Sequence, residues 1–353
     1  STSAVAVDAA GRRMSVWIDD TRPSEPAPNP DVFFRYNNGT GAPIIGVASP
    51  NNEWETDPQA VFMKDGAALA CWTANKGEKS LNNLNNILAA QDIACSYWNG
   101  TIWGSPVKVI DDGEADGTVS LAYFAENKAL AVWVHNADPD KRAMQRTAWQ
   151  LRYSIFNPTT GEGAAAFTGP AVVTGTDTGK ADQMPAVAPD GNGNAMLVWA
   201  RDDDGQFDTE LAAVTNGTNV DAKNLDSHIM WSKLGETGWT APAALATGGE
   251  ATRLSPSLAP APGGSFLAVW EEKAPGKMRS IKYAVLSGGA WGTPGNVAES
   301  SQFMEDPKAV VDAAGKATVI WRGYAAGGKG ALFSATGNMA AQITWSEPQQ
   351  ITH

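Results

Sequence analysis

The feature that most constrains the fold is an apolar segment ending in tryptophan that occurs six times along the chain. Two copies read LAVWVHN and MLVWARDDD, so the apolar run gives way to polar residues soon after the tryptophan. Neighbouring copies are 51 to 71 residues apart, a period typical of repeat architectures in which each repeat is one supersecondary unit. The six tryptophans are Trp17, Trp72, Trp133, Trp199, Trp270 and Trp321. Because six such repeats account for all 353 residues, we expect one closed ring and not two domains.

Every repeat has the same internal order, which predicts four strands. The Trp strand is preceded by an apolar segment with a Gly turn, such as MPAVAPDGNG. It is followed by a polar loop, a third strand such as LRYSI and a short fourth strand. LAVW and MLVW are apolar at consecutive positions, which indicates a strand buried on both faces, as between propeller blades. The sequence therefore predicts an all-β, six-bladed β-propeller with four antiparallel strands per blade. We expect a single domain, 1–353, with blades near 1–52, 53–113, 114–179, 180–250, 251–302 and 303–353.

A turn late in three repeats resembles the Asp box, Ser-x-Asp-x-Gly-x-x-Trp. The first, SYWNGTIW, starts at Ser96, keeps the Ser, Gly and Trp, and has Trp98 at the Asp position. SKLGETGW from Ser232 keeps Ser and Trp, and AVLSGGAW from Ala284 keeps Gly and Trp. With these degenerate boxes the chain resembles the sialidase-like (Asp-box, BNR-type) six-bladed propellers, in which the box lies between the third and fourth strands of a blade.

The resemblance implies a test for sialidase chemistry, which uses three arginines on the substrate carboxylate, a Tyr–Glu pair and an Asp acid. Arg201, Arg253 and Arg322 are the arginines that could converge, with Glu272, Tyr324 and Asp20 nearby. The Arg-Ile-Pro motif expected early in the family is absent from this sequence. We therefore expect the family's fold without its catalysis.

The only two cysteines fall on neighbouring strands of the second repeat. Cys71 lies on the Trp strand and Cys95 on the third strand, which should run antiparallel to each other. A cross-strand disulfide and a pair of buried free thiols are both compatible with this position. A disulfide would imply an oxidising, extracytoplasmic compartment.

The polar loops that follow the Trp strands are long, so the face that carries them is where we expect a binding site. Charged residues near this mouth could hold a sugar or an oxygen-ligated cation, or could pair across blades and solvate the rim. The candidate ligand-binding residues are Asp19, Asp20, Asp57, His135, Arg201, Asp202, Arg253, Glu272 and Arg322. Four aromatic residues could either stack on sugars or pack in the core: Trp54, Trp98, Trp149 and Tyr324.

The stretch DDDGQFD after the fourth tryptophan has the composition of a calcium loop. Asp202, Asp204 and Asp208 are the candidate ligands, although the spacing and the distal Glu of an EF-hand are missing. A solvated acidic turn is the alternative. Ca²⁺ is thus a possible ligand, and no other cofactor is expected.

The net charge of −12 disfavours binding to a phosphate backbone, so we expect no nucleic-acid partner. No apolar run reaches the length needed to span a bilayer, so we expect no membrane insertion. The sequence makes no prediction of oligomeric state.

We predict an extracytoplasmic module (secreted, periplasmic or cell-surface), lectin- or adhesin-like, that binds a carbohydrate or protein ligand without catalysis. The first alternative is a glycan-active enzyme: a sialidase-like glycoside hydrolase, or a polysaccharide lyase with His135 as its base. The second alternative is a structural surface or assembly domain.

Overall fold

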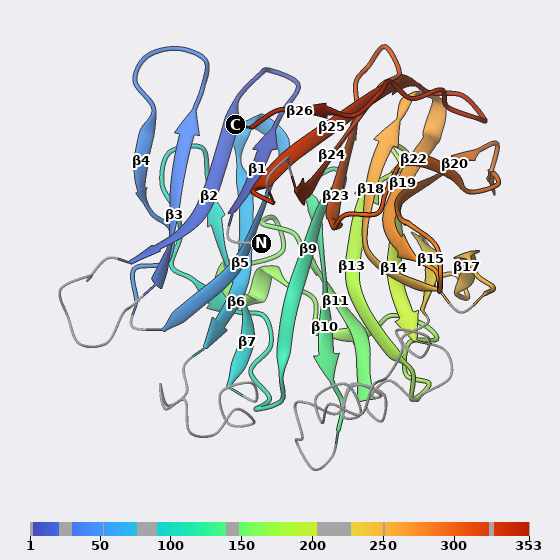
Figure 1. Cartoon of the computed structure of the whole chain (residues 1–353). Coiled ribbons are helices and arrows are strands. Elements are labelled where there is room, and N and C mark those ends of the chain that lie inside the picture. The colour runs from blue at the N-terminus through green and yellow to red at the C-terminus, as the bar shows by residue number, and fades with distance from the viewer. Residues whose placement is uncertain are drawn as a thin grey trace. The chain divides into compact units, whose positions relative to one another are not determined.

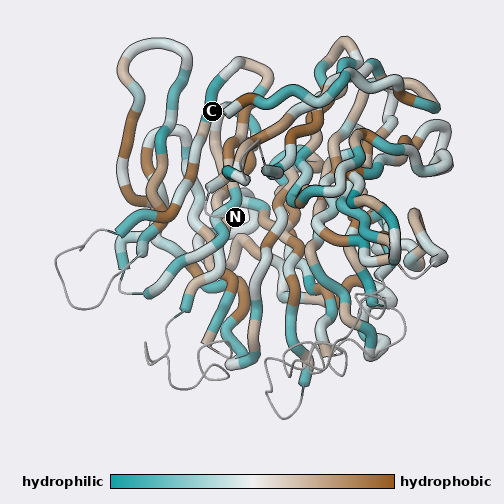
Figure 2. Tube along the Cα trace, in the orientation of Figure 1, coloured by the Kyte–Doolittle hydropathy of each residue, from teal (hydrophilic) through white to brown (hydrophobic). Residues whose placement is uncertain are grey.

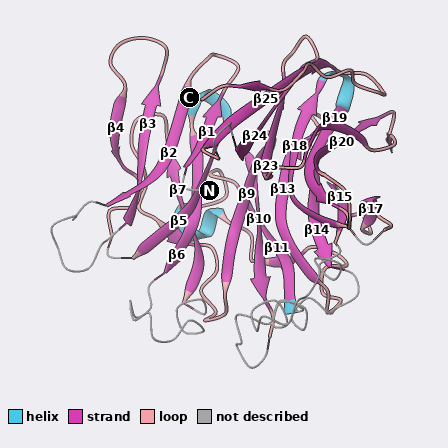
Figure 3. Cartoon of the chain, in the orientation of Figure 1, coloured by secondary structure: helices cyan, strands magenta, loops and turns pink. Residues whose placement is uncertain are grey.

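The computed structural model describes residues 3–20, 30–51, 53–75, 90–138, 148–202, 227–249, 251–324 and 328–352. The described chain is almost entirely β-structure (Figure 3), and its helical segments are the short 3-10 turns Lys64–Gly66, Gly163–Ala166 and Pro262–Gly264. None of the described helices is long or apolar enough to cross a membrane.

The first of two units, Ser1–Asp177, contains three four-stranded sheets whose strands pair in chain order (Figure 1). The first sheet is β1 (Ser3–Val7), β2 (Arg13–Asp20), β3 (Pro30–Asn37) and β4 (Ile44–Val47). The second is β5 (Trp54–Phe62), β6 (Ala68–Asn75), β7 (Gln91–Trp98) and β8 (Val107–Lys108). The third is β9 (Asp116–Ala125), β10 (Lys128–Asn136), β11 (Trp149–Phe156) and β12 (Ala171–Val172).

The second unit, Thr178–His353, contains three sheets of the same plan. The fourth sheet is β13 (Ala181–Pro189), β14 (Ala195–Asp202), β15 (His228–Gly235), β16 (Gly238–Trp239) and β17 (Ala243–Ala246). The fifth is β18 (Thr252–Ala261), β19 (Ser265–Lys273), β20 (Arg279–Ser287), β21 (Ala290–Trp291) and β22 (Gly295–Ser300). The sixth is β23 (Met304–Val311), β24 (Lys316–Tyr324), β25 (Gly330–Asn338) and β26 (Gln349–Gln350).

These six sheets are the blades of the predicted six-bladed β-propeller, and every strand pair in them is antiparallel. In blades 4 and 5 the third strand pairs both with a two-residue strand beyond its turn and with the true fourth strand, β17 or β22. The predicted fold class and strand number are confirmed.

The repeated tryptophans lie on the second strand of each blade and form the centre of the packing. Trp72, Trp133, Trp199 and Trp270 are fully buried, Trp321 is nearly so, and Trp17 is half-buried. Strands β10 and β14 are buried at consecutive positions, as LAVW and MLVW predicted. In Figure 2 the hydrophobic residues lie along the strands and the hydrophilic ones gather at the turns.

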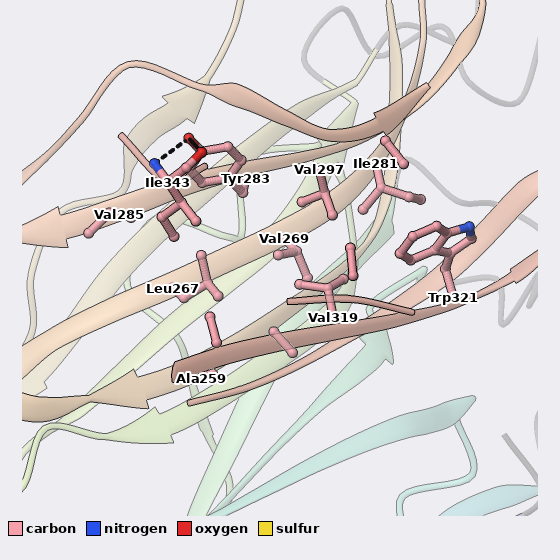
Figure 4. Packing of buried hydrophobic residues seen from close by; sticks show 14 of the residues in the cluster. Ala259, Leu267, Val269, Ile281, Tyr283, Val285, Val297, Val319, Trp321 and Ile343 are labelled. Atoms are coloured by element: carbon pink, nitrogen blue, oxygen red, sulfur yellow. Dashed lines mark hydrogen bonds between the residues drawn. The ribbon is translucent and has the colours of Figure 1, made fainter. Parts of the chain in front are cut away.

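Neighbouring blades within a unit pack through layers of aliphatic side chains. Between blades 5 and 6, Val269 of β19 and Ile281 of β20 belong to the same buried cluster as Val319 of β24 (Figure 4). The Tyr283 hydroxyl accepts a 2.8 Å hydrogen bond from the Ile343 amide, which ties the two blades together. The cross-blade core therefore fixes the position of any group carried at the ends of these strands.

The innermost strand of five blades carries a bulge at the same place. The bulged residues, each in the left-handed region with φ between 49° and 55°, are Asp57, Thr118, Met184, Ser255 and Asp306. Pro follows four of them and has no amide hydrogen to donate, so it fits an interrupted ladder. Each bulge shifts the register, and the strand continues beyond it. Residues on both sides of a bulge, such as Asp182 and Val187, therefore belong to one strand.

The turn after β7 buries the tryptophan that the sequence left either as a stacking surface or as a core residue. Trp98 is 1% exposed and lies 5.4–5.6 Å from the rings of Tyr36, Phe34 and Trp103. Of the two roles open for Trp98 from the sequence, core packing is the one present, because this ring fills the space between blades 1 and 2. The Ser96 hydroxyl closes the turn with a 2.7 Å bond to the Gly104 carbonyl.

The two cysteines form a disulfide. Cys71 of β6 and Cys95 of β7 are directly opposite each other in the ladder, with Cα atoms 4.0 Å apart, and both are fully buried. Of the two arrangements open from the sequence, the cross-strand disulfide is the one present.

Candidate functional site

A pocket in the second unit brings together charged and aromatic side chains from blades 5 and 6. Its volume is about 320 Å³, and Phe303, Glu305, Arg322, Gly323 and Tyr324 form part of its wall. Two more charged residues of blade 5 contact or electrostatically influence this group. We call the set the blade 5–6 site: Glu271, Arg279, Phe303, Glu305, Arg322 and Tyr324.

The order of the strands explains why these residues meet. Arg322 and Tyr324 are two positions apart on β24 and so point to the same face of the sheet. Glu305 of β23 lies directly opposite Arg322 in the ladder. Gly323 lies between them, where an added Cβ would come 3.1 Å from the Phe333 ring and 3.3 Å from the Phe303 carbonyl. The glycine therefore allows the backbone and the aromatic wall to approach each other.

Two aromatic rings form one side of the pocket. The ring centroids of Phe303 and Tyr324 are 5.8 Å apart, and Tyr324 is 45% exposed. The Arg279 guanidinium lies over the Phe303 ring, 4.9 Å from its centroid. A rigid apolar surface with a hydroxyl at its edge suits the apolar face and the hydroxyl groups of a sugar ring.

Arg322 holds two carboxylates at the edge of the pocket. Its Nη2 atom lies 2.5 Å from Glu305 Oε1 and 3.0 Å from Asp306 Oδ2. The arginine side chain remains largely exposed. Arg322 thus fixes the orientation of the Glu305 carboxylate while it faces solvent.

Glu271 is the acid of the site with a perturbed protonation equilibrium. Burial raises the pKa of Glu271 above its ordinary value of 4.5, and the nearby carboxylates of Asp306 and Glu305 raise it further. A 2.8 Å hydrogen bond from the Ser255 hydroxyl and the charge of Arg279 oppose the rise. The site therefore pairs an acid whose pKa is raised with a carboxylate, Glu305, that is ion-paired to arginine.

All three arginines expected to clasp a substrate carboxylate are engaged within their own blades, Arg322 by Glu305 and Asp306 as described above. Arg201 donates to Asp182 at 2.7 Å, and Arg253 donates to Glu272 at 2.7 Å and to the Gly248 carbonyl. Both arginines are 5% exposed. The alternative that rim charges pair with each other holds for these residues, and the described pairs join adjacent strands of one blade.

Glu272 and Tyr324 do not form the expected pair, because the Glu272 carboxylate is ion-paired with Arg253 and Lys282. The neighbouring residue, Glu271, faces blade 6 instead. The period of two along a strand could have separated these glutamates, had the end of the strand been known.

The remaining candidates lie in or next to other strands. Asp19 is exposed and Asp20 half-buried at the end of β2, and Asp57 forms the bulge of β5. Asp202 is buried at the end of β14, whereas Asp204 and Asp208 lie outside the described residues, so the calcium loop stays a prediction. Trp54 and Trp149 are half-buried.

His135 is buried in the first unit, opposite Asp116 in the ladder between β9 and β10. Its Nδ1 atom lies 2.9 Å from Asp116 Oδ1, and its Nε2 atom lies 2.8 Å from Glu114 Oε2. The imidazole is thus enclosed by acids.

Glu55 is a second buried acid of the first unit. It is fully buried and accepts 2.7 Å hydrogen bonds from Ser49 and Asn51. Burial raises its pKa to about 7, and the charges of Asp31 and Glu53 add to the rise.

Comparison with known proteins identifies the fold. No protein-family model and no curated protein matches the sequence. Among solved structures, an ulvan lyase from a new polysaccharide lyase family is similar over 99% of this chain and 82% of its own, with a TM-score of 0.60 and 10% identity. The α-L-arabinanase of Penicillium chrysogenum, solved with arabinobiose, is similar over 95% and 92%, with a TM-score of 0.55 and 12% identity.

The sialidase of Trypanosoma rangeli, solved with the inhibitor DANA, is similar over 94% of this chain and 54% of its own, with a TM-score of 0.53 and 11% identity. The chain therefore has the fold of propellers that include a polysaccharide lyase, an arabinanase and a sialidase.

Proposed function

We propose that the protein is a glycan-active enzyme that hydrolyses glycosidic bonds at the blade 5–6 site. The observation that carries the proposal is the contrast between two acids beside one aromatic pocket. Burial raises the pKa of Glu271, while the Glu305 carboxylate lies 2.5 Å from Arg322 Nη2. Two carboxyl groups in such different environments are what a general acid and its anionic partner require.

In this proposal Tyr324 and Phe303 bind a sugar ring, and Glu271 gives its proton to the bridging oxygen as that oxygen leaves the anomeric carbon. Glu305 either takes a proton from the water that attacks the anomeric carbon or attacks that carbon itself. In both cases the glycosidic C–O bond breaks and one water molecule is consumed. Arg322 keeps the Glu305 carboxylate oriented through the reaction.

The names of the similar structures support carbohydrate as the substrate class, since they are a polysaccharide lyase, an arabinanase and a sialidase. They favour the enzyme alternative over the binding module that the sequence led us to expect first. The Cys71–Cys95 disulfide supports an extracytoplasmic location, because such bonds persist in oxidising compartments.

The test is an assay for release of reducing ends from a panel of plant, algal and animal polysaccharides. We expect activity on at least one of them, with loss of about 10²-fold or more for Glu271→Gln and for Glu305→Gln. Glu236→Gln, an exposed acid in the turn after β15, serves as the matched control and should retain full activity.

Three other outcomes would count against hydrolysis. Products that carry a new double bond would indicate elimination, and hence a lyase. Retention on a glycan array without product release, lost in Tyr324→Ala, would indicate a binding module. Neither retention nor release on any glycan would reject the assignment of this site to carbohydrate.

A further inference from the structure

A group of acids surrounds His135 in blade 3, in a different unit from the blade 5–6 site. Asp116 opens β9 and lies opposite His135 of β10, while Asp112 and Glu114 lie in the segment that precedes β9 (Figure 1). His135 is fully buried, and Asp116 is 1% exposed. Asp112, Asp116 and His135 each bring one possible metal ligand atom within 4.8 Å of the other two.

Both nitrogens of the imidazole face carboxylates. Nδ1 lies 2.9 Å from Asp116 Oδ1 and 4.0 Å from Asp112 Oδ2, and Nε2 lies 2.8 Å from Glu114 Oε2. An ionised carboxylate only accepts hydrogen bonds, and a neutral imidazole has one N–H to give. Although Nε2 is close to Glu114, it makes no hydrogen bond among the described residues. An imidazole whose single proton is on Nε2 directs its Nδ1 lone pair at the oxygens of Asp112 and Asp116.

The net negative charge around His135 and an unpaired oxygen of Asp116 both favour a bound cation. Three carboxylates face His135, and the described cation beside them is Arg152, whose Nη1 lies 3.3 Å from Asp112 Oδ2. Trp133 Nε1 donates to Asp116 Oδ1 at 2.6 Å, but the buried Oδ2 of Asp116 has no hydrogen-bond partner within the described chain. A buried carboxylate oxygen that has no hydrogen-bond donor is costly unless a cation binds it.

The next two blades show how the same strand positions are neutralised elsewhere. In blade 4 the residue opposite Asp182 is Arg201, and in blade 5 the residue opposite Glu272 is Arg253. Trp199 also donates to Asp182, as Trp133 does to Asp116. Blade 3 therefore keeps the tryptophan and the acid of blade 4 but replaces the permanent cation with histidine.

We propose that this group is a binding site for a divalent transition metal, Zn²⁺ or Mn²⁺, that supplies the cation arginine supplies in blades 4 and 5. Its ligands are Nδ1 of His135 and the carboxylates of Asp112 and Asp116. Trp133 orients Asp116 through its hydrogen bond to Oδ1, and Glu114 adds a third negative charge beside the imidazole. The imidazole ligand favours these metals over Ca²⁺, which takes oxygen ligands.

The experiment is titration calorimetry of the full chain, freed of metal with a chelator, against ZnCl₂, MnCl₂ and CaCl₂. We expect one site that takes Zn²⁺ or Mn²⁺ more tightly than Ca²⁺. Asp112→Asn, whose side chain is one-third exposed and so leaves the core intact, should weaken binding at least about 10-fold. His228→Ala on β15 is the matched histidine control and should bind as the wild type does.

Nitrogen NMR of the imidazole provides a second readout that does not depend on folding of a variant. With the metal bound, His135 should show a proton on Nε2 and a shifted, proton-free Nδ1. Protons on both nitrogens with Zn²⁺ present would overturn the proposal in favour of a buried imidazolium. So would wild-type protein that gives no heat with any of the metals, an Asp112→Asn variant that binds Zn²⁺ unchanged, or a preference for Ca²⁺.

Discussion

Arg253 and Glu272 lie directly opposite each other on β18 and β19, with Nε and Oε2 2.7 Å apart and the guanidinium 5% exposed. Breaking a buried ion pair leaves the partner charge uncompensated, which costs about 3 kcal/mol or more. We expect Glu272→Gln to lower the free energy of unfolding by about that amount, measured by urea denaturation. Lys64→Gln, which removes the exposed pair with Glu126, should leave the unfolding midpoint unchanged. Equal effects of the two changes would contradict this reading.

Stability should depend on pH through Glu55. Its folded-state pKa of about 7 lies above its ordinary 4.5, so between these values the folded protein holds a proton that the unfolded chain releases. The contribution of Glu55 to stability is therefore greatest below pH 4.5. It falls by about 3 kcal/mol as the pH rises from 4.5 to 7, and is constant above pH 7. Glu55→Gln should remove this contribution and be more stable than the wild type at pH 8. If the free energy of unfolding of Glu55→Gln falls with pH as steeply as that of the wild type, Glu55 is not the source of the pH dependence.

The pH dependence of catalysis should report Glu271. Because the pKa of Glu271 is raised and the charge of Arg279 opposes that rise, Arg279→Gln should raise it further. If Glu271 donates the proton, the alkaline limb of the pH–rate profile should then move to higher pH. Lys277→Gln, an exposed change just before β20, is the control and should leave the limb in place. If the alkaline limb of the pH–rate profile stays in place in Arg279→Gln, Glu271 is not the general acid.

The Cys71–Cys95 bond should stabilise the first unit. It joins residues 24 positions apart, and a loop of this size is worth about 3 kcal/mol through restriction of the unfolded chain. The Cys71→Ala/Cys95→Ala double variant should have a free energy of unfolding lower by that amount, and should therefore unfold at a lower urea concentration. Since both sulfurs are buried, a reductant should leave the native bond intact until the protein unfolds, as mass spectrometry after alkylation would show. Ready reduction of the folded protein would contradict this.

Two aromatic residues should respond to truncation in opposite ways. Trp98→Ala removes a buried ring that contacts three others and should lower the free energy of unfolding by about 3–5 kcal/mol. Tyr324→Ala removes a ring that is 45% exposed and should leave stability nearly unchanged while it weakens glycan binding. Urea denaturation and glycan retention, measured on both variants, compare these effects directly.

Much of the fold could be predicted from the sequence because one residue type marks each blade. The tryptophans Trp72 to Trp270 sit in strands buried on both faces, and burial on both faces produces an apolar run that needs no alternation to be seen. The role of Trp98 stayed open because the Asp-box alignment assigned it to a turn, whereas it ends β7 and packs inward.

The sites were less predictable, because they depend on register. The bulges at Met184 and Ser255 extend the inner strands and bring Asp182 opposite Arg201, and Arg253 opposite Glu272. A period of two then sends Glu271 to the opposite face from Glu272, a separation that the sequence reveals only once the end of the strand is known. Asp112 and Glu114 reach His135 from the connection between two blades, and their position depends on the path of that connection.

The prolines that follow the bulges have a consequence for self-association. In blades 2, 4, 5 and 6 they lie in β5, β13, β18 and β23, each of which is the terminal strand in the pairing order of its sheet. An edge strand with a regular row of amides is a template on which another chain can add a strand. Here a kinked backbone and a missing donor interrupt that row at the same point four times. A blade that transiently separates from its neighbour would therefore expose an edge poorly suited to nucleate intermolecular β-sheet.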